Sequence, residues 1–254
     1  KLLAKLALPT IAAQLINMLY NIVDRIYIGH IPDTGAMALT GVGVCMPLIM
    51  IITAFAALVG NGGAPRATIF MGKNKKDDAE KILANCFTMQ ILLSIILTVV
   101  LLIWNRDFLL AFGASANTIE YAASYMNIYA LGTIFVQLTL GMNAFITAQG
   151  FAKEGMLSVL IGAIANIILD PIFIFGLHMG VRGAALATVI SQCCSCIWVI
   201  SFLFGKRTTL RIRGKNMGLK AAYILPCLAL GSAIFIMQGS ESIISVCFNS
   251  SLLK

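Results

Sequence analysis

The sequence predicts an all-α, polytopic membrane protein with six complete transmembrane spans and the beginning of a seventh. Of the 254 residues, 59% are hydrophobic and only 11% are charged, whereas a soluble domain carries about 25% charged residues. The apolar residues also gather in runs, and a helix of about 20 apolar residues crosses a bilayer. This composition excludes an ordinary soluble enzyme, a disordered chain and a nucleic-acid-binding module with a basic face.

Seven apolar runs follow one another along the chain. In order, they cover residues 6–29, 38–71, 82–104, about 119–148, 156–177, 183–204 and, after a basic loop, 221 onward. The second run is longer than a span requires, so that helix should tilt or protrude from the bilayer. Pro171, in the fifth run, has no backbone N–H to donate, so it should kink its helix and free a carbonyl about one turn earlier.

The loop charges predict the orientation of these spans, because cytoplasmic loops are enriched in Lys and Arg. The loops on the opposite side hold only Arg106 and Arg182. We therefore interpret the basic residues behind the net charge of +8 as determinants of membrane topology, with the N-terminus in the cytoplasm. A nucleic-acid-binding patch is the weaker interpretation. The Lys and Arg residues on the predicted cytoplasmic side are Lys1, Lys5, Lys73, Lys75, Lys76, Lys81, Lys153, Lys206, Arg207, Arg211, Arg213, Lys215 and Lys220.

A weak internal repeat suggests how the chain is organised. Residues 6–9 (LALP) open the first span, and residues 228–231 (LALG) open the seventh. Because six spans separate the two, both would start on the same side, as in transporters built from parallel repeats. We therefore expect a six-helix lobe over residues 1–204, a cytoplasmic basic loop over 205–220 and the start of a second lobe over 221–254. The sequence begins with Lys1 and ends shortly after the second lobe would start. We therefore expect a fragment, or one half that pairs with another half.

The seven cysteines lie inside apolar runs, where free Cys behaves as a small buried hydrophobe. The Cys193, Cys194 and Cys196 cluster has no second ligand pair at zinc spacing and no His nearby. We therefore expect neither disulfides nor a zinc site, and no cofactor beyond a coupling ion.

Two carboxylates fall inside spans, where an ionisable residue is costly and by default marks a function. Asn17, Asn21 and Asp24 share one helical face, and Asn166 and Asp170 share another by their i, i+4 spacing. Counted from the predicted outer ends of the spans, Asp24, Asp170 and Thr188 fall in the same layer, within about one helical turn. Together these side chains could bind a proton or a small cation.

Other polar and small residues in the spans have simpler interpretations. Asp24 could merely be satisfied by hydrogen bonds that keep its span in register, and the adjacent Arg25 should extend to the outer interface. Gln14, Gln90 and Gln137 are more typical of interhelical hydrogen bonds than of ligands. Methionines and aromatic residues could line a cavity that accepts varied compounds, or could equally face lipid or core.

Several motifs resemble the multidrug and toxic compound extrusion family, in particular its DinF-like bacterial subgroup. They are residues 8–14 with 21–30 in the first span, 38–43 continuing to 62–65 in the second, 148–150, the run 166–171 (NIILDP) and residues 180–185. The residues around 240–242 and 249–251 resemble that family's seventh span. The resemblance therefore covers essentially the whole chain.

The resemblance implies half of a twelve-helix antiporter that exports bulky, often cationic, amphipathic compounds against an inward proton or sodium gradient. It implies a coupling site of Asp24, Asn143, Asn166, Asp170 and Thr188, with Asn143 included mainly on this ground. If sodium is the coupling ion, the predicted ligands are Asp24, Asn166, Asp170 and Thr188. The predicted substrate cavity is lined by Gln14, Asn17, Tyr20, Asn21 and Met142. The other partners are the bilayer of the cell membrane and a second lobe, supplied by more chain or by a second copy.

Two rival functions stay open at this point. A flippase for lipid-linked sugars would have a related fold, but it would call for basic residues facing a pyrophosphate, and only Arg25 and Arg66 are candidates. An integral-membrane transferase would call for Asp-rich metal motifs or a His–Asp pair at the membrane face. Neither His30 nor His178 has an acid at helical spacing, so we expect a transporter and no enzyme.

Overall fold

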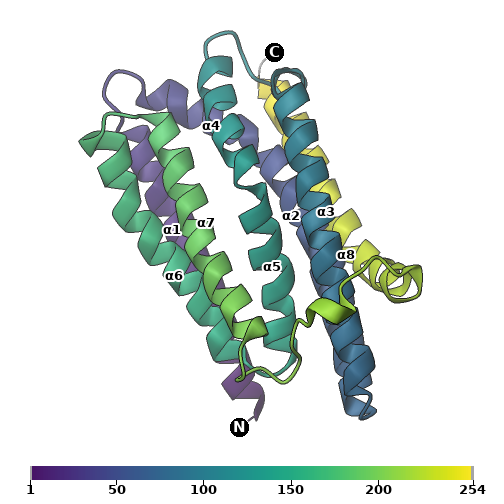
Figure 1. Cartoon of the computed structure of the whole chain (residues 1–254). Helices are drawn as coiled ribbons and strands as arrows, with labels where there is room; N and C mark the ends of the chain where they lie inside the picture. The colour runs from purple at the N-terminus through teal and green to yellow at the C-terminus, as the bar shows by residue number, and fades with distance from the viewer. Residues whose placement is uncertain (1, 253–254) are drawn as a thin grey trace.

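The computed structural model describes residues 2–252, with side chains for residues 7–247, and this range contains helices and no strand. The side chains of Lys1, Lys5 and Asn249–Ser251, which entered the predictions above, lie outside the described residues. Figure 1 shows the helices arranged as one bundle. They are α1 (Leu2–Gly29), α2 (Gly35–Gly72), α3 (Lys76–Ala111), α4 (Ile119–Leu131), α5 (Thr133–Ala148), α6 (Ala152–Pro171), η1 (Ile172–Gly176), α7 (Val181–Phe204), η2 (Gly214–Asn216) and α8 (Ala221–Leu252).

Five helical segments are long and apolar enough to cross a membrane, namely α2, α3, α6 with η1, α7 and α8, and the α4–α5 pair makes a sixth if it is counted as one span. These correspond to the second through seventh apolar runs, so the predicted polytopic membrane fold is confirmed. The 28-residue α1 is about 42 Å long, which suffices for a span. Gln14, Asn17, Asn21 and Asp24 make it less apolar, and its crossing of the membrane stays a prediction.

The fourth apolar run is broken, whereas the sequence predicted a single stretch over 119–148. The axes of α4 and α5 meet at 58° around Gly132. A Cβ at Gly132 would lie 2.4 Å from Val189 Cγ2 of α7. The bend therefore brings the backbone of this span against α7 at a point where a side chain has no room.

The fifth run ends differently from a simple proline kink. The α-helix α6 stops at Pro171 and continues as the π-helical turn η1. The turn is closed by the Leu177 N–H, which donates to the Ile172 carbonyl at 2.8 Å. Such π turns occur mostly as single turns in otherwise α-helical segments and are frequent at functional sites.

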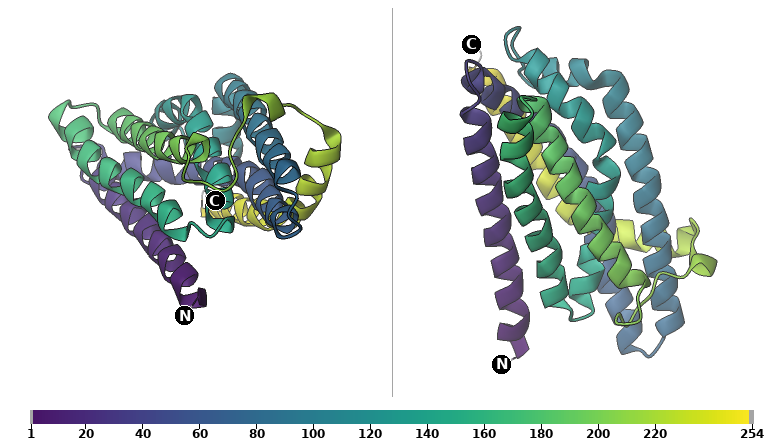
Figure 2. Two further views of the ribbon diagram at one scale, coloured as in Figure 1. Left: turned by 60° about the horizontal axis from the view of Figure 1, so that its bottom comes forward. Right: turned by 60° about the vertical axis from the view of Figure 1, so that its left-hand side comes forward.

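The helices pack in two groups joined through α5 and α7. α1 lies along α6, which packs on α7, while α8 lies along α2, and α2 also contacts α3 and α5 (Figure 2). The buried apolar side chains form two clusters at different depths. One is centred on residues such as Ile28, Val42 and Met126, and the other on residues such as Ile82, Phe145 and Val199. The segment expected to begin a second lobe is thus packed directly on this one.

Two buried glutamines connect neighbouring helices to α2. The Gln90 amide of α3 donates to the Ala56 carbonyl at 2.9 Å, and the Gln137 amide of α5 donates to the Ile52 carbonyl at 2.8 Å. Both side chains are fully buried. The interpretation of these two residues as interhelical hydrogen bonds is confirmed.

The basic loop over residues 205–220 is anchored by side chains of the helix ends. The Arg213 Nε lies 2.7 Å from Glu80 Oε2 of α3, and Glu80 is 2% exposed. Asn85 of α3 donates to the Asn216 carbonyl at 3.3 Å and accepts from the Lys220 N–H, just before α8, at 2.8 Å. At the end of α5, Gln149 Oε1 accepts from the Leu210 N–H at 2.7 Å. The loop therefore holds the start of α8 close to α3 and α5.

Replacing Glu80 with Gln is expected to loosen this loop. The change removes the ion pair with Arg213 and should cost about 1 kcal/mol of local stability, or roughly a fivefold increase in loop opening. Limited trypsin digestion measures this as faster cleavage after the loop Lys and Arg residues. The matched control is Asp77→Asn, because Asp77 is exposed and forms its ion pair with Lys81 of the same helix, at the surface. Equal cleavage rates in the two variants would contradict the anchoring role.

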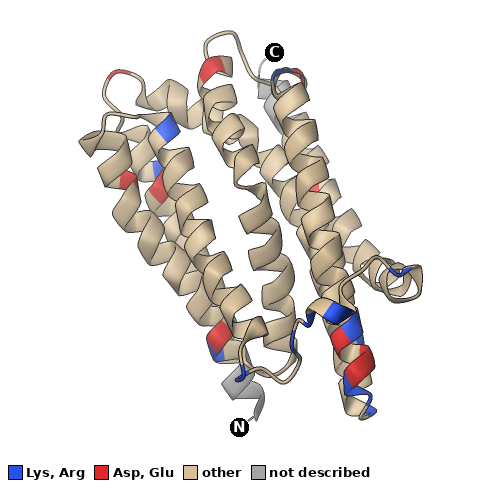
Figure 3. Cartoon of the chain, viewed as in Figure 1, with Lys and Arg blue, Asp and Glu red and all other residues tan. Residues whose placement is uncertain are grey.

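Charged residues are unevenly distributed along the bundle. Figure 3 shows most Lys and Arg at the end where the N-terminus lies, around the α2–α3 turn and the loop that precedes α8. Few lie at the opposite end (Figure 3), where α3 ends shortly after Arg106 and α7 begins beside Arg182. The asymmetry expected from the sequence is therefore present in the folded chain.

Candidate functional site

Two acids, Asp24 of α1 and Asp170 of α6, meet between these helices. The carboxyls of Asp24 and Asp170 lie within hydrogen-bonding reach of each other. Asp24 is 7% exposed and Asp170 is fully buried. Both acids lie near the ends of their helices. Asp24 lies about one turn before the end of α1, and Asp170 lies in the last turn of α6, where Pro171 ends the α-helix.

One amide bonds Asp170 directly, and another amide lies about one turn before Asp24. The Asn166 Nδ2 donates to Asp170 Oδ1 at 3.2 Å, and both side chains are buried. On α1, the Asn21 Nδ2 donates to the Asn17 carbonyl at 2.6 Å. Each pair has the i, i+4 spacing that places both residues on one helical face. The acids are therefore presented toward each other on helical backbones and not on loops.

Three buried oxygens at this point have no hydrogen-bond donor among the described residues, namely Asp24 Oδ1, Asp170 Oδ2 and Asn166 Oδ1. A buried polar atom without a partner is costly, and carboxylate and amide oxygens are the ligands that hard cations prefer. A proton shared by the two carboxyls, or a small cation seated between them, would satisfy these oxygens. The residues present therefore fit a proton or sodium site.

A tyrosine of α4 lies close to the acids, and this part of the site was missed from the sequence. Tyr125 and Tyr129 of α4 are buried and stack with ring centroids 6.1 Å apart. The Tyr125 hydroxyl lies within hydrogen-bonding reach of the Thr188 hydroxyl of α7. The i, i+4 spacing of Tyr125 and Tyr129 could have predicted this pair, because it places two rings with polar hydroxyls on one face of a span.

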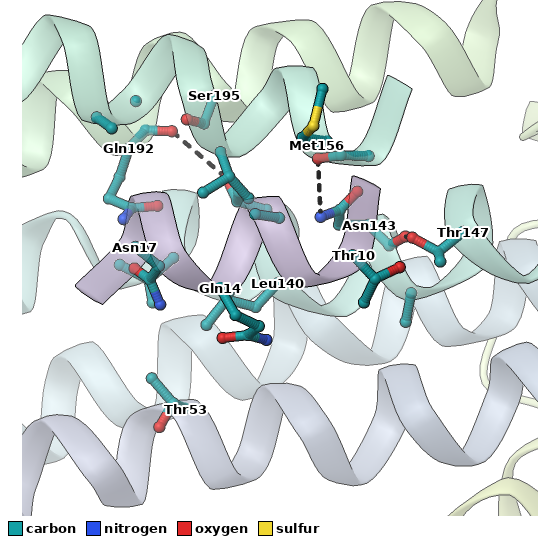
Figure 4. Close-up of a pocket in the computed structure, with 18 of the residues that line it drawn as sticks. Thr10, Gln14, Asn17, Thr53, Leu140, Asn143, Thr147, Met156, Gln192 and Ser195 are labelled. Carbon is teal, nitrogen blue, oxygen red and sulfur yellow. Dashed lines mark hydrogen bonds between the residues drawn. The ribbon is translucent and has the colours of Figure 1, made fainter. Parts of the chain in front are cut away.

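A cavity of about 660 Å³ opens beside this cluster. Asn166 and Thr188 belong both to the acid cluster and to the cavity wall, and Tyr20, Asn21 and Tyr129 extend the wall on that side. Figure 4 shows the side chains that reach the cavity from several helices, among them Gln14, Asn17, Leu140, Asn143 and Gln192. The described residues of the wall are neutral, with amides, hydroxyls and apolar groups in alternation.

The structure places four of the five predicted cavity residues in this wall, namely Gln14, Asn17, Tyr20 and Asn21. Met142, which was also predicted to line the cavity, does not. Its side chain is fully buried in the core cluster that contains Phe145 and Ile146. On α5 the wall is formed by residues 136, 139, 140, 143, 144 and 147. At 100° per residue, Met142 points about 100° away from Asn143 and away from that face.

Asn143 lies apart from the acid cluster. Its Nδ2 donates to the Gly155 carbonyl at the start of α6 at 3.4 Å, and its Oδ1 is buried without a donor. It lines the same cavity as Asn166 and Thr188. The structure thus brings Asp24, Asp170 and Asn166 together, connects Thr188 through Tyr125, and leaves Asn143 on the cavity wall.

Comparisons with known proteins agree with this architecture. The family model MatE matches residues 9–172. The "Multidrug export protein MepA" of Staphylococcus haemolyticus (strain JCSC1435) is 28% identical over 237 residues, which is 93% of this chain and 52% of the relative. A solved structure named only "protein A" superposes with a TM-score of 0.95 and 31% identity, over all of this chain and 56% of its own.

A second solved structure is described as the outward-facing conformation of a multidrug resistance MATE family transporter of the MOP superfamily. It superposes with a TM-score of 0.88 and 27% identity, over 96% of this chain and 53% of its own. The chain thus spans about half the length of the relatives it matches.

Proposed function

Because this chain belongs to the MatE family, we propose that it is the ion-coupling half of a transporter that exports drug-like compounds in exchange for protons or sodium ions. The observation that carries the proposal is the buried Asp24–Asp170 pair, which adjoins a cavity of about 660 Å³ through Asn166 and Thr188. The relatives named as multidrug exporters support it. Neither this geometry nor the family points to a catalysed reaction, so transport is proposed in place of an enzymatic activity.

The proposed mechanism starts from the repulsion between the two carboxylates. Two negative charges held close together in a low-dielectric layer repel each other strongly. A proton, or a sodium ion bound by Asp24, Asn166, Asp170 and Thr188, removes this repulsion and draws α1 toward α6. α1 contacts the bundle mainly through α6, and many of its apolar side chains, such as Leu15, are exposed. Ion binding would therefore change the position or bend of α1 and reduce the cavity, which releases the substrate outward.

The wall of the cavity suits amphipathic compounds. Amide and hydroxyl groups such as Gln14, Asn17 and Gln192 can hydrogen-bond in several ways, and Leu140 and Met156 supply adaptable apolar surface. The nearby acids would attract a cationic compound when they are ionised. The exported substrates are therefore proposed to be bulky, apolar or amphipathic and often cationic.

The distribution of Lys and Arg predicts how the bundle is oriented in the membrane. Under the positive-inside rule, the end of the bundle that carries most Lys and Arg (Figure 3) faces the cytoplasm, and the N-terminus lies there. We propose the cell membrane as its location. A second lobe, from further chain or a second copy, would complete the cavity, because the relatives are about twice as long as this chain.

A lipid-linked oligosaccharide flippase is the alternative proposal. Such a protein needs cations that face a pyrophosphate, but the described residues that line the cavity include no Lys or Arg. Arg25 is exposed on α1 and is not among the residues that line the cavity. The neutral wall therefore favours the exporter.

Replacing Leu140 with Trp tests the export function and the role of this cavity. The larger ring would occupy part of the space, so efflux of a bulky fluorescent cation such as ethidium should fall roughly fivefold, on the scale of one misfit group in a pocket. The measurement is dye accumulation in cells that express the chain with its second lobe. Leu131→Trp is the matched control, because Leu131 is 62% exposed on α4 and lies outside the cavity. Efflux that is equal in both variants, or absent even before substitution, would contradict the proposal.

A further inference from the structure

A second pocket lies at the end of α7, far along that helix from the acid cluster. It has a volume of about 340 Å³ and is formed by Trp198, Ser201, Phe202, Gly205, Lys206 and Arg207. We call these six residues the Trp198 groove. The export mechanism uses none of them. The groove has an apolar wall on the helix and two cations at the point where the helix ends.

The apolar wall is held in place by contacts from α6. The Trp198 Nε1–H donates to the Glu154 carbonyl at 3.2 Å. The Phe202 ring packs edge-on against Phe151, with centroids 5.2 Å apart. Both rings are therefore fixed before any ligand arrives, which lowers the entropic cost of binding. Trp is also the residue most typical of the level where lipid tails meet head groups.

The mouth of the groove is positively charged. Lys206 and Arg207 are exposed, and the Arg211 guanidinium donates to the Lys206 carbonyl at 3.2 Å, which adds a third cation nearby. Glu154, whose backbone carbonyl accepts from Trp198, adjoins Lys153 in the sequence, so this pair adds no net charge beside the groove. A ligand that fits must combine an anionic head with an apolar body.

The surface around the groove carries exposed apolar side chains on a helix that is long and apolar enough to span the membrane. On the same helix, Ile197 is 61% exposed and Phe204 is 48% exposed, and α7 is one of the membrane-spanning helices. The groove thus opens from a lipid-facing surface toward the charged end of the bundle. An anionic phospholipid of the adjoining leaflet matches this layout by both charge and shape.

We infer that the Trp198 groove binds an anionic phospholipid, with an acyl chain against Trp198 and Phe202 and the phosphate on Lys206 and Arg207. Two cations at the surface favour an anionic over a zwitterionic lipid by at least about tenfold. The site goes beyond the proposed transport function, because it concerns only the membrane-embedded surface of α7 and not the cavity. A lipid held there would fix the junction between α7 and the loop that leads to α8.

Fluorescence quenching by brominated lipids tests the site directly. The chain has two tryptophans, Trp104 and Trp198, so a Trp104→Phe variant reports on the groove alone. It is placed in nanodiscs of phosphatidylcholine that contain one-fifth brominated phosphatidylglycerol, or one-fifth brominated phosphatidylcholine. With a tenfold preference the site would hold the brominated anionic lipid about 70% of the time, against about 20% for the zwitterionic lipid. Trp198 should therefore be quenched much more strongly by the anionic lipid.

Charge variants complete the test. Lys206→Gln with Arg207→Gln should abolish the excess quenching, while Lys215→Gln with Lys220→Gln should preserve it, because those exposed lysines lie in the same loop but outside the groove. Quenching that is equal for the two lipids would overturn the inference. So would excess quenching that survives in the Lys206 and Arg207 variant. Relief of the quenching by inorganic phosphate at millimolar concentration would also overturn it, because the site would then take a free anion.

Discussion

Replacing Asp170 with Asn is expected to weaken ion binding by this chain roughly a hundredfold, equivalent to about 3 kcal/mol. The buried Asp24–Asp170 pair offers two carboxylates and the Asn166 oxygen to one ion. The substitution removes one negative charge from a region where water cannot replace it. The measurement is binding of radioactive sodium to the purified chain, together with infrared detection of a buried protonated carboxyl after a shift in pH. The first reports sodium coupling and the second reports proton coupling.

Asp107→Asn is the control for this experiment. It makes the same chemical change at an exposed position on α3, and it should leave both signals unchanged. If Asp170→Asn retains sodium binding and also retains the carboxyl signal, the pair is not the ion site. Asp24→Asn should behave like Asp170→Asn, because the two carboxyls share the ion.

The second large effect is expected at the contact between α2 and α8. A Cβ added at Gly62 would lie 2.0 Å from the Cys227 carbonyl oxygen, and one added at Gly231 would lie 1.9 Å from the Leu58 carbonyl oxygen. Helix backbones this close are typical of small residues at membrane helix contacts. Gly231→Val should therefore push α8 away from α2 and lower the Tm in detergent by about 5–10 °C.

The chain supplies a matched position for this prediction. Gly239 is also on α8, but no atom of the described part of the chain lies within 4 Å of a Cβ added there. Gly239→Val should change the Tm by no more than about 2 °C. A similar loss of Tm in both variants would show that the effect comes from a larger side chain in α8 and not from its contact with α2.

Much of the fold could be predicted because hydropathy determines it locally. The apolar runs match α2 through α8, since a helix must satisfy its backbone within the bilayer. Asp24 and Asp170 could be identified for a related reason, because an acid in a span is too costly to be incidental. Counting residues from the span ends sufficed to place both at one depth.

The remaining features depend on contacts that leave no local signal. At the bend, Gly132 packs against Val189, which lies on another helix. Met142 was assigned to the cavity because methionine side chains suit a cavity that accepts varied compounds, and periodicity alone cannot tell a core face from a cavity face. Glu80, Asn85 and Gln149 anchor a loop that is distant in sequence from each of them, so no motif could reveal their role.

Substrate-driven ion flux in proteoliposomes tests the central claim most directly. The chain would be reconstituted alone and together with a second lobe, each with Asp170 intact or replaced by Asn, and ion movement would be recorded when a cationic drug is added. We predict flux when both lobes and Asp170 are present, flux by the chain alone only if two copies assemble, and none in any Asp170→Asn form. Full flux in the Asp170→Asn form, or no flux in the complete form despite correct insertion, would contradict an ion-coupled exporter and favour the flippase.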